Sequence, residues 1–119
     1  MKNKQLYEYA QKLSIFNEFD KKLPVKISFY LHKNIKVIQE AVEEIEMARM
    51  SIGQKFGKLN ETKNGYNILP ENMQQANQEL IDLFELEQDI KIHYFKIEDF
   101  DNIELSYQEL SAIMFMIEE

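Results

Sequence analysis

The sequence predicts a mostly α-helical domain of the α+β class, in which a long helix packs on two or three shorter helices beside a minor sheet of two or three strands. Three observations predict this fold class. Apolar residues recur at three- and four-residue spacing along most of the 119 residues, as they do on one face of a helix. Two Pro and three Gly are few, which favours long regular elements. One stretch near residue 90 alternates instead, as strands do. The length suits a single domain spanning residues 1–119.

The first predicted helix covers residues 4–19. Asn3 is its predicted N-cap, and the helix is expected to end before Pro24, because the residue preceding a proline is pushed out of the helical region. Its apolar face consists of Leu6, Tyr9, Leu13 and Phe16.

The second predicted helix, residues 29–56, carries the longest apolar repeat, a heptad stripe. Ser28 is its predicted N-cap and Gly57 its predicted end, while residues 25–27 are expected to be extended. The stripe consists of Leu31, Ile35, Ile38, Val42, Ile45, Ile52 and Phe56, with Arg49 as its one polar member. Such a repeat predicts packing against another helix at a shallow angle, in the same chain or in a second copy, so a homo-oligomer through this helix is one expectation.

Arg49 and the methionines of the chain each have two interpretations. Arg49 either lays its aliphatic stem on the stripe and reaches a carboxylate such as Glu46, or acts as a partner determinant at an interface. Methionines at helical spacing are expected in the core, although they can also form an adaptable binding surface. These methionines are Met47, Met50, Met73, Met114 and Met116.

Residues 57–69 interrupt the helical pattern. The Asn64-Gly65 pair favours a type I′ turn, and so a small hairpin. Pro70 then suits the first turn of a helix predicted over residues 70–87. Because the connection is short, this helix is expected to lie antiparallel to the long one.

The alternating stretch, residues 89–96, predicts a strand whose mate is either residues 25–27 or residues 66–69. Ser106 and Glu109 form a capping box that opens a last helix, expected to continue through Ile117. Residues 113–117 are apolar on every face of that helix, so they are either buried all round or offer one face to a partner.

The sequence predicts no catalytic, cofactor-binding or metal-binding residues. Cys is absent, which excludes thiolate chemistry. His32 and His93 have no partner at metal-ligand spacing and are interpreted as structural. The acidic run 98–104 lacks the Gly and Glu of a calcium loop. No apolar run is long enough to span a membrane.

Charge is distributed unevenly along the chain. Residues 1–70 hold 12 Lys and Arg against 8 Asp and Glu, whereas residues 71–119 hold 2 lysines against 13 carboxylates. The net charge of −7 disfavours direct binding to nucleic acid. The acidic portion and the last helix are therefore the candidate partner-binding region. Its candidate residues are Asp82, Glu85, Asp89, Glu98, Asp99, Asp101, Glu104, Met114 and Phe115.

Two stretches carry a resemblance to a known group of proteins. One is KLPVKISF at residues 22–29, followed by Lys33-Asn34, and the other is IELSYQELSA at residues 103–112, followed by FMIEE. Together they resemble small phage and prophage proteins of unknown function from low-GC Gram-positive bacteria. The resemblance implies a phage-encoded accessory protein, and it carries over no catalytic residue. Because the sequence has no signal-peptide core, the expected location is the cytoplasm of the host cell.

Two functions are expected to compete. The first is a non-enzymatic accessory protein that binds a phage or host protein, as an assembly chaperone or a small tail-associated component does. The alternative is an anti-CRISPR-like inhibitor, whose carboxylates imitate nucleic acid and occupy the basic channel of a host defence nuclease.

Overall fold

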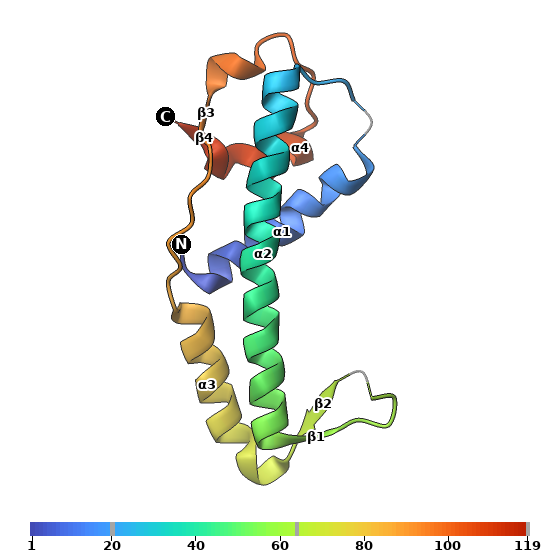
Figure 1. The fold of residues 1–119 in the computed structure, drawn as a ribbon, viewed down its shortest axis with the longest axis vertical. Coiled ribbons are helices and arrows are strands. Elements are labelled where there is room, and N and C mark those ends of the chain that lie inside the picture. Colours follow the sequence, from blue (N-terminus) through green and yellow to red (C-terminus); the bar gives the residue numbers. More distant parts are fainter. Residues whose placement is uncertain (20, 64, 119) are drawn as a thin grey trace.

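The computed structural model contains one helix, α2 (Val25–Phe56), that runs most of the length of an elongated molecule of 57 × 29 × 21 Å (Figure 1). The structure describes residues 1–19, 21–63 and 65–118. The other α-helices are α1 (Asn3–Leu13), α3 (Met73–Glu85) and α4 (Tyr107–Ile113). Short 3₁₀ helices are η1 (Ser14–Glu18), η2 (Pro70–Asn72), η3 (Ile97–Phe100) and η4 (Met114–Met116). The strands are β1 (Gly57–Leu59), β2 (Tyr66–Ile68), β3 (Phe95–Lys96) and β4 (Ile117–Glu118). The predicted fold class is confirmed.

The hydrophobic core lies around the N-terminal half of α2. In Figure 1, α1 and α4 cross behind this half, and α3 lies antiparallel to the C-terminal half. The chain after α3 then returns along α2 to β3. The core side chains come from α1, α2, β3, α4 and η4. They include Leu6, Leu31, Ile38, Ile45, Phe95, Ile113 and Met116.

The heptad repeat of α2 is used inside the chain, but its buried face is turned from the predicted one. Ile38 and Ile45 are buried as expected, whereas Ile35 and Val42 are only half-buried. The positions buried in their place are Asn34 and Ala41. The apolar pattern alone could not indicate this rotation, because an asparagine and an alanine add little to a hydrophobic stripe.

The long helix begins four residues earlier than predicted. Pro24 is the N-cap, and the backbone N–H of Ser28 already donates to the carbonyl of Pro24 at 3.0 Å. The predictions of an extended segment at residues 25–27 and of an N-cap at Ser28 are therefore wrong. A proline tolerates this position because the first helical turn needs no N–H from it. Burial of Ile27 against the core favours the longer helix.

The N-terminal helix also differs in its cap. Lys2, not Asn3, precedes α1, and Asn3 is the buried first residue of the helix. The Asn3 side chain donates instead to the carbonyl of Leu83 at 2.8 Å, near the end of α3. The helix predicted over residues 4–19 is α1 continued by η1, and the one predicted over residues 70–87 is η2 continued by α3, which ends at Glu85.

The predicted hairpin is present, but its turn is longer than expected. Strands β1 and β2 pair antiparallel with Leu59 opposite Tyr66, and the N–H of Asn60 donates to the carbonyl of Gly65 at 2.9 Å. Gly65 therefore pairs with the other side of the hairpin rather than forming a two-residue turn, and it has no positive φ. Asn64, the other half of the predicted turn, lies outside the described residues.

The predicted strand over residues 89–96 is reduced to Phe95–Lys96. It pairs in parallel with β4, and neither predicted mate joins it, because residues 25–27 are helical and residues 66–68 pair with β1. The last helix ends at Ile113 and continues as η4, so the prediction of helix through Ile117 is also wrong. None of the described helices has an apolar stretch long enough to cross a membrane.

Candidate partner-binding surface

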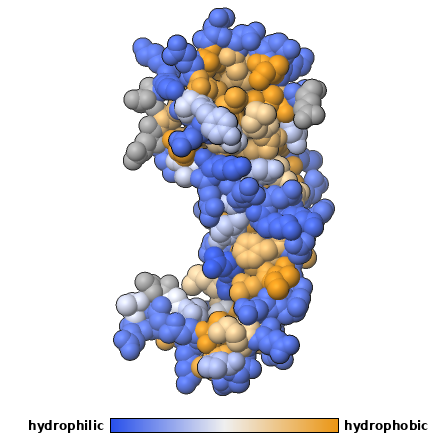
Figure 2. Space-filling model, turned by 180° about the vertical axis from the view of Figure 1, so that it is seen from behind, coloured by the Kyte–Doolittle hydropathy of each residue, from blue (hydrophilic) through white to orange (hydrophobic). Residues whose placement is uncertain are grey.

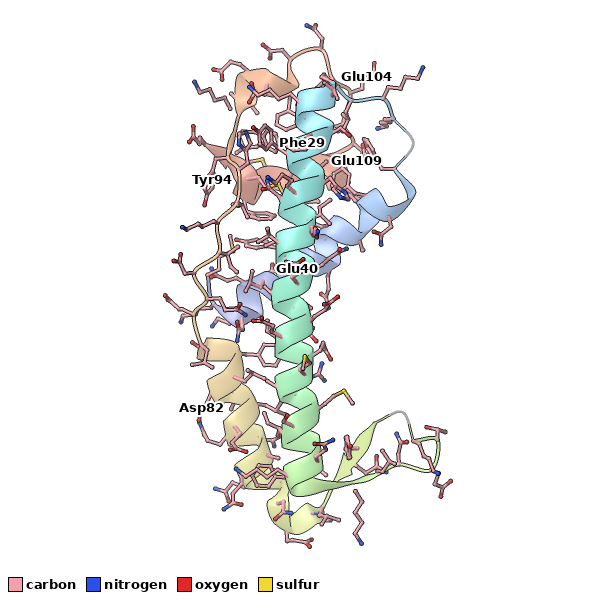
Figure 3. All side chains as sticks on the ribbon, viewed as in Figure 1. Phe29, Glu40, Asp82, Tyr94, Glu104 and Glu109 are labelled. Atoms are coloured by element: carbon pink, nitrogen blue, oxygen red, sulfur yellow. The ribbon has the colours of Figure 1, made fainter. Side chains whose placement is uncertain are left out.

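The acidic candidate residues do not form one cluster. Asp82 and Glu85 belong to α3, and Asp89 follows it. Glu98 and Asp99 belong to η3, and Asp101 and Glu104 to the loop after it. Figure 3 shows Asp82 and Glu104 in opposite halves of the long axis. The candidates therefore divide into a group on α3 and a group at the other end of the molecule.

Glu85 is already paired within the chain. Its carboxylate oxygens accept hydrogen bonds from Lys2 Nζ at 2.8 Å and from Lys4 Nζ at 2.7 Å. These bonds lower the pKa of Glu85 to about 2. The side chain is 45% exposed, so water and salt screen the pair and its effect on stability is small. The basic N-terminus thus folds onto the acidic portion, and the charge division along the sequence is not a division in space.

Several other carboxylates also have intrachain partners. Asp82 accepts a hydrogen bond from Gln78 Nε2 at 2.9 Å, and Asp99 accepts one from the backbone N–H of Lys96 at 2.9 Å. Asp101 and Glu104 are exposed and line a shallow recess of 470 Å³ that Lys21 and Lys22 also line. The acidic loop therefore has lysines beside it.

The last helix exposes one apolar face and buries the other. Ile113 and Met116 are buried in the core, whereas Met114 is 54% exposed and Tyr107 is 87% exposed. Ile15 of η1 is also exposed and lines, with Tyr107, a recess of 270 Å³ between the two elements. We call Ile15, Tyr107 and Met114 the α4 surface. In Figure 2, hydrophobic residues gather on the back of the upper body, where Figure 1 places α4.

Of the two apolar candidates, which belong to η4 directly after this helix, only Met114 is exposed. The Phe115 ring stacks on the Tyr9 ring of α1, with centroids 4.0 Å apart and planes 5° from parallel. Phe115 therefore belongs to the contact between the C-terminal segment and α1.

The methionines contradict the expectation that they lie in the core. Only Met116 is buried, whereas Met47, Met50, Met73 and Met114 are exposed. On α2 the cause is geometric, since Met47 lies two residues beyond the buried Ile45 and therefore on the opposite side of the helix. Phe29, 57% exposed, lies on the same outer side and was not among the candidates. The two-residue offset from the buried positions is the signal that could have identified both.

Arg49 and His93 contact other side chains of the chain, whereas His32 does not face the core. Arg49 Nη1 lies 3.1 Å from Glu46 Oε1 and 3.0 Å from the Tyr7 hydroxyl, which agrees with the structural interpretation. His93 stacks on Tyr30 with ring centroids 3.8 Å apart, and His32 is exposed. In the described part of the chain, no group of three His, Asp or Glu side chains is placed to hold a metal ion.

Comparison of the chain with protein-family models, curated proteins and solved structures finds no match. The features that bear on function are thus the exposed apolar side chains on α4 and on the outer side of α2.

Proposed function

We propose that this protein is a non-enzymatic phage accessory protein that binds a phage or host protein through the α4 surface, as an assembly chaperone or a small tail-associated component does. The proposal rests on the exposure of Tyr107 and Met114. Both side chains lie on a short segment from which Ile113 and Met116 are buried in the core. Large apolar side chains held together on a surface are typical of protein-binding sites.

The α4 surface is also held rigidly, which favours binding because little conformational entropy is lost. The capping box orders the start of α4, and Glu109 accepts a hydrogen bond from Lys21 Nζ at 2.6 Å. The stacking of Phe115 on Tyr9 holds the end of the same segment against α1.

The alternative, mimicry of nucleic acid by carboxylates, has less support from the geometry. A mimic needs a continuous set of unpaired negative charges. Here Glu85 pairs with two lysines, and Asp82 and Glu104 lie in opposite halves of the molecule. In the group around η3, the exposed carboxylates on which a mimic would depend are Glu98, Asp101 and Glu104.

The test is capture of partners from infected cells, followed by mass spectrometry, with variants of the α4 surface. Tyr107→Asp and Met114→Asp each add a charge to an exposed position, so they are expected to leave the fold intact. The matched control is Leu59→Asp, an exposed leucine in β1 at the other end of the molecule. We expect the partner to be retained by the wild type and the control, and to bind at least about tenfold more weakly to both α4 variants.

A second set of variants distinguishes the alternative. Reversal of Glu98, Asp101 and Glu104 to Lys should be tolerated by a partner of the α4 surface. If these reversals abolish binding while Met114→Asp does not, and if binding falls steeply with salt, the mimic is correct and the proposal fails. A partner that binds every variant equally well also contradicts it.

A further inference from the structure

The outer side of α2 carries a second regular stripe. The buried residues of this helix include Ile27, Leu31, Asn34, Ile38, Ala41 and Ile45. The residue two positions after each of them lies about 200° around the helix, on the side away from the core. We call these residues the outer stripe: Phe29, Lys33, Lys36, Glu40, Glu43 and Met47. All six are exposed.

No other described helix covers the outer stripe in the view of Figure 1, where α2 lies in front of α1 and α4. Figure 3 labels Phe29 and Glu40 along the front of this helix. Phe29 and Met47, at the two ends of the stripe, are 57% and 70% exposed. Two large apolar side chains therefore flank four charged ones on an accessible helix face.

The four charges have no ionic partners among the residues that the structure describes. The ion pairs formed there involve other side chains, and the Lys33 Nζ lies over the Phe29 ring, 5.4 Å from the ring centroid. The charges are also segregated, with Lys33 and Lys36 toward the N-terminus of α2 and Glu40 and Glu43 toward its C-terminus.

This arrangement is complementary to itself. Phe29 and Met47 are equidistant from position 38, as are Lys33 and Glu43, and Lys36 and Glu40. We infer that the outer stripe binds a second copy of this chain, with the two α2 helices antiparallel and a twofold axis beside position 38. Lys33 then lies opposite Glu43 of the second copy, Lys36 opposite Glu40, and Phe29 opposite Met47, each contact occurring twice by symmetry.

The charges also select the direction of pairing. In a parallel arrangement each lysine would lie beside a lysine and each glutamate beside a glutamate, which is repulsive. In the antiparallel arrangement all four charge contacts are attractive. From Phe29 to Met47 the stripe spans about 27 Å, at about 1.5 Å per residue. A single helix pair of this length lies at the low end of interface sizes, so the dimer dissociates on dilution.

The dimer is distinct from the proposed function and compatible with it. Because α4 lies behind α2 in Figure 1, pairing through the outer stripe leaves the α4 surface exposed. The dimer then presents two α4 surfaces to a repetitive partner, which raises the apparent affinity without any new contact.

The test is sedimentation velocity from about 1 µM to about 1 mM protein, with two double variants of the full chain. Glu40→Lys combined with Glu43→Lys makes all four charges positive, and Lys33→Glu combined with Lys36→Glu makes them all negative. We expect the wild type to form dimers with rising concentration. Each double variant alone should dissociate at least about tenfold more readily, and an equimolar mixture of the two should form a heterodimer.

The control variants carry the same changes of net charge elsewhere. Glu98→Lys with Asp101→Lys matches the first variant, and Lys58→Glu with Lys91→Glu matches the second. Circular dichroism verifies that every variant is folded. The proposal is supported if the two double variants dimerise only when they are mixed, and if the control variants dimerise like the wild type. A wild type that stays monomeric throughout, a mixture that stays monomeric, or controls that dissociate as readily as the stripe variants would overturn it.

Discussion

Asn34 best explains why the chain near His93 forms no strand, although the alternating sequence pattern predicts one there. It is 2% exposed, its Nδ2 donates to the carbonyl of His93 at 2.8 Å, and its Oδ1 accepts from the backbone N–H of His93 at 2.8 Å. A side-chain amide has the same donor and acceptor as a peptide group, so Asn34 takes the place of a neighbouring strand. The chain around His93 can therefore remain extended without a β-ladder.

Replacing Asn34 by Leu, which has a similar volume, should destabilise the protein by about 2 kcal/mol or more, because both backbone groups of His93 lose their partner. Urea unfolding measures the difference. The matched control is Asn77→Leu, at an exposed position on α3, which should change the free energy of unfolding by about 0.5 kcal/mol or less. Equal effects of the two variants would mean that the Asn34 bonds contribute nothing.

Among the helices and strands, α4 depends most for its stability on the hydrogen bonds at its ends. It has only seven residues, so few intrahelical hydrogen bonds hold it. Ser106 Oγ accepts from the N–H of Glu109 at 3.1 Å, and Glu109 Oε1 accepts from the N–H of Ser106 at 2.8 Å. The hydrogen bond from Lys21, together with those from Ser106, lowers the pKa of Glu109. The contact between Lys21 and Glu109 therefore holds the start of α4 against the segment that precedes α2.

Ser106→Ala should reduce the free energy of unfolding by about 0.5–2 kcal/mol, the usual effect of losing an N-cap side chain. Thermal or urea unfolding measures it. Ser51→Ala is the matched control, because the Ser51 hydroxyl donates to the carbonyl of Met47 within α2 and caps no helix. No difference between the two variants would show that the capping box does not stabilise α4, and a larger loss would indicate a further partner of the Ser106 hydroxyl.

At the scale of the whole molecule, stability is concentrated at one end of an elongated body. The main core surrounds α2 from Ile27 to Ile45, and Ile38 and Ile45 are almost fully buried in it. The C-terminal end of α2 packs on α3 and the hairpin, where Phe56 of α2 and Ala76 of α3 are buried. Gly57 lies where this hairpin leaves α2, and a Cβ there would lie 2.5 Å from the carbonyl oxygen of Asn67.

Ile38→Asp should unfold the protein or remove most of its stability. A buried carboxylate without a partner is unfavourable by several kcal/mol, a large part of the roughly 5–15 kcal/mol that stabilises a typical domain. Gln39→Asp, at the adjacent exposed position, introduces the same charge and should melt like the wild type. Circular dichroism melting curves compare the three proteins, and a wild-type melting temperature for Ile38→Asp would exclude a packed core at this position.

Local patterns in the sequence were sufficient to predict the fold class, the approximate positions of the described α-helices, the hairpin and the N-cap of α4 at Ser106. These features depend on residues close together in the chain: helical periodicity, a capping box, and a proline at the start of η2. The exposure of the candidate partner-binding residues followed the prediction only at some positions. Met114 is exposed as a partner-binding residue requires, whereas Phe115 packs on Tyr9.

The buried side of α2, the strand that pairs with β3 and the charges that remain unpaired could not be predicted from the sequence. Each of these depends on contacts between residues far apart in sequence. Asn34 meets His93, Phe95 pairs with Ile117, and Glu85 binds Lys2. A heptad pattern predicts that one face of a helix is buried. When another element packs slightly to one side of that face, the residue next to a predicted position is buried in its place. The distribution of charge on the surface likewise differs from its distribution along the sequence, because Lys2 and Lys4 of the basic portion pair with Glu85 of the acidic portion.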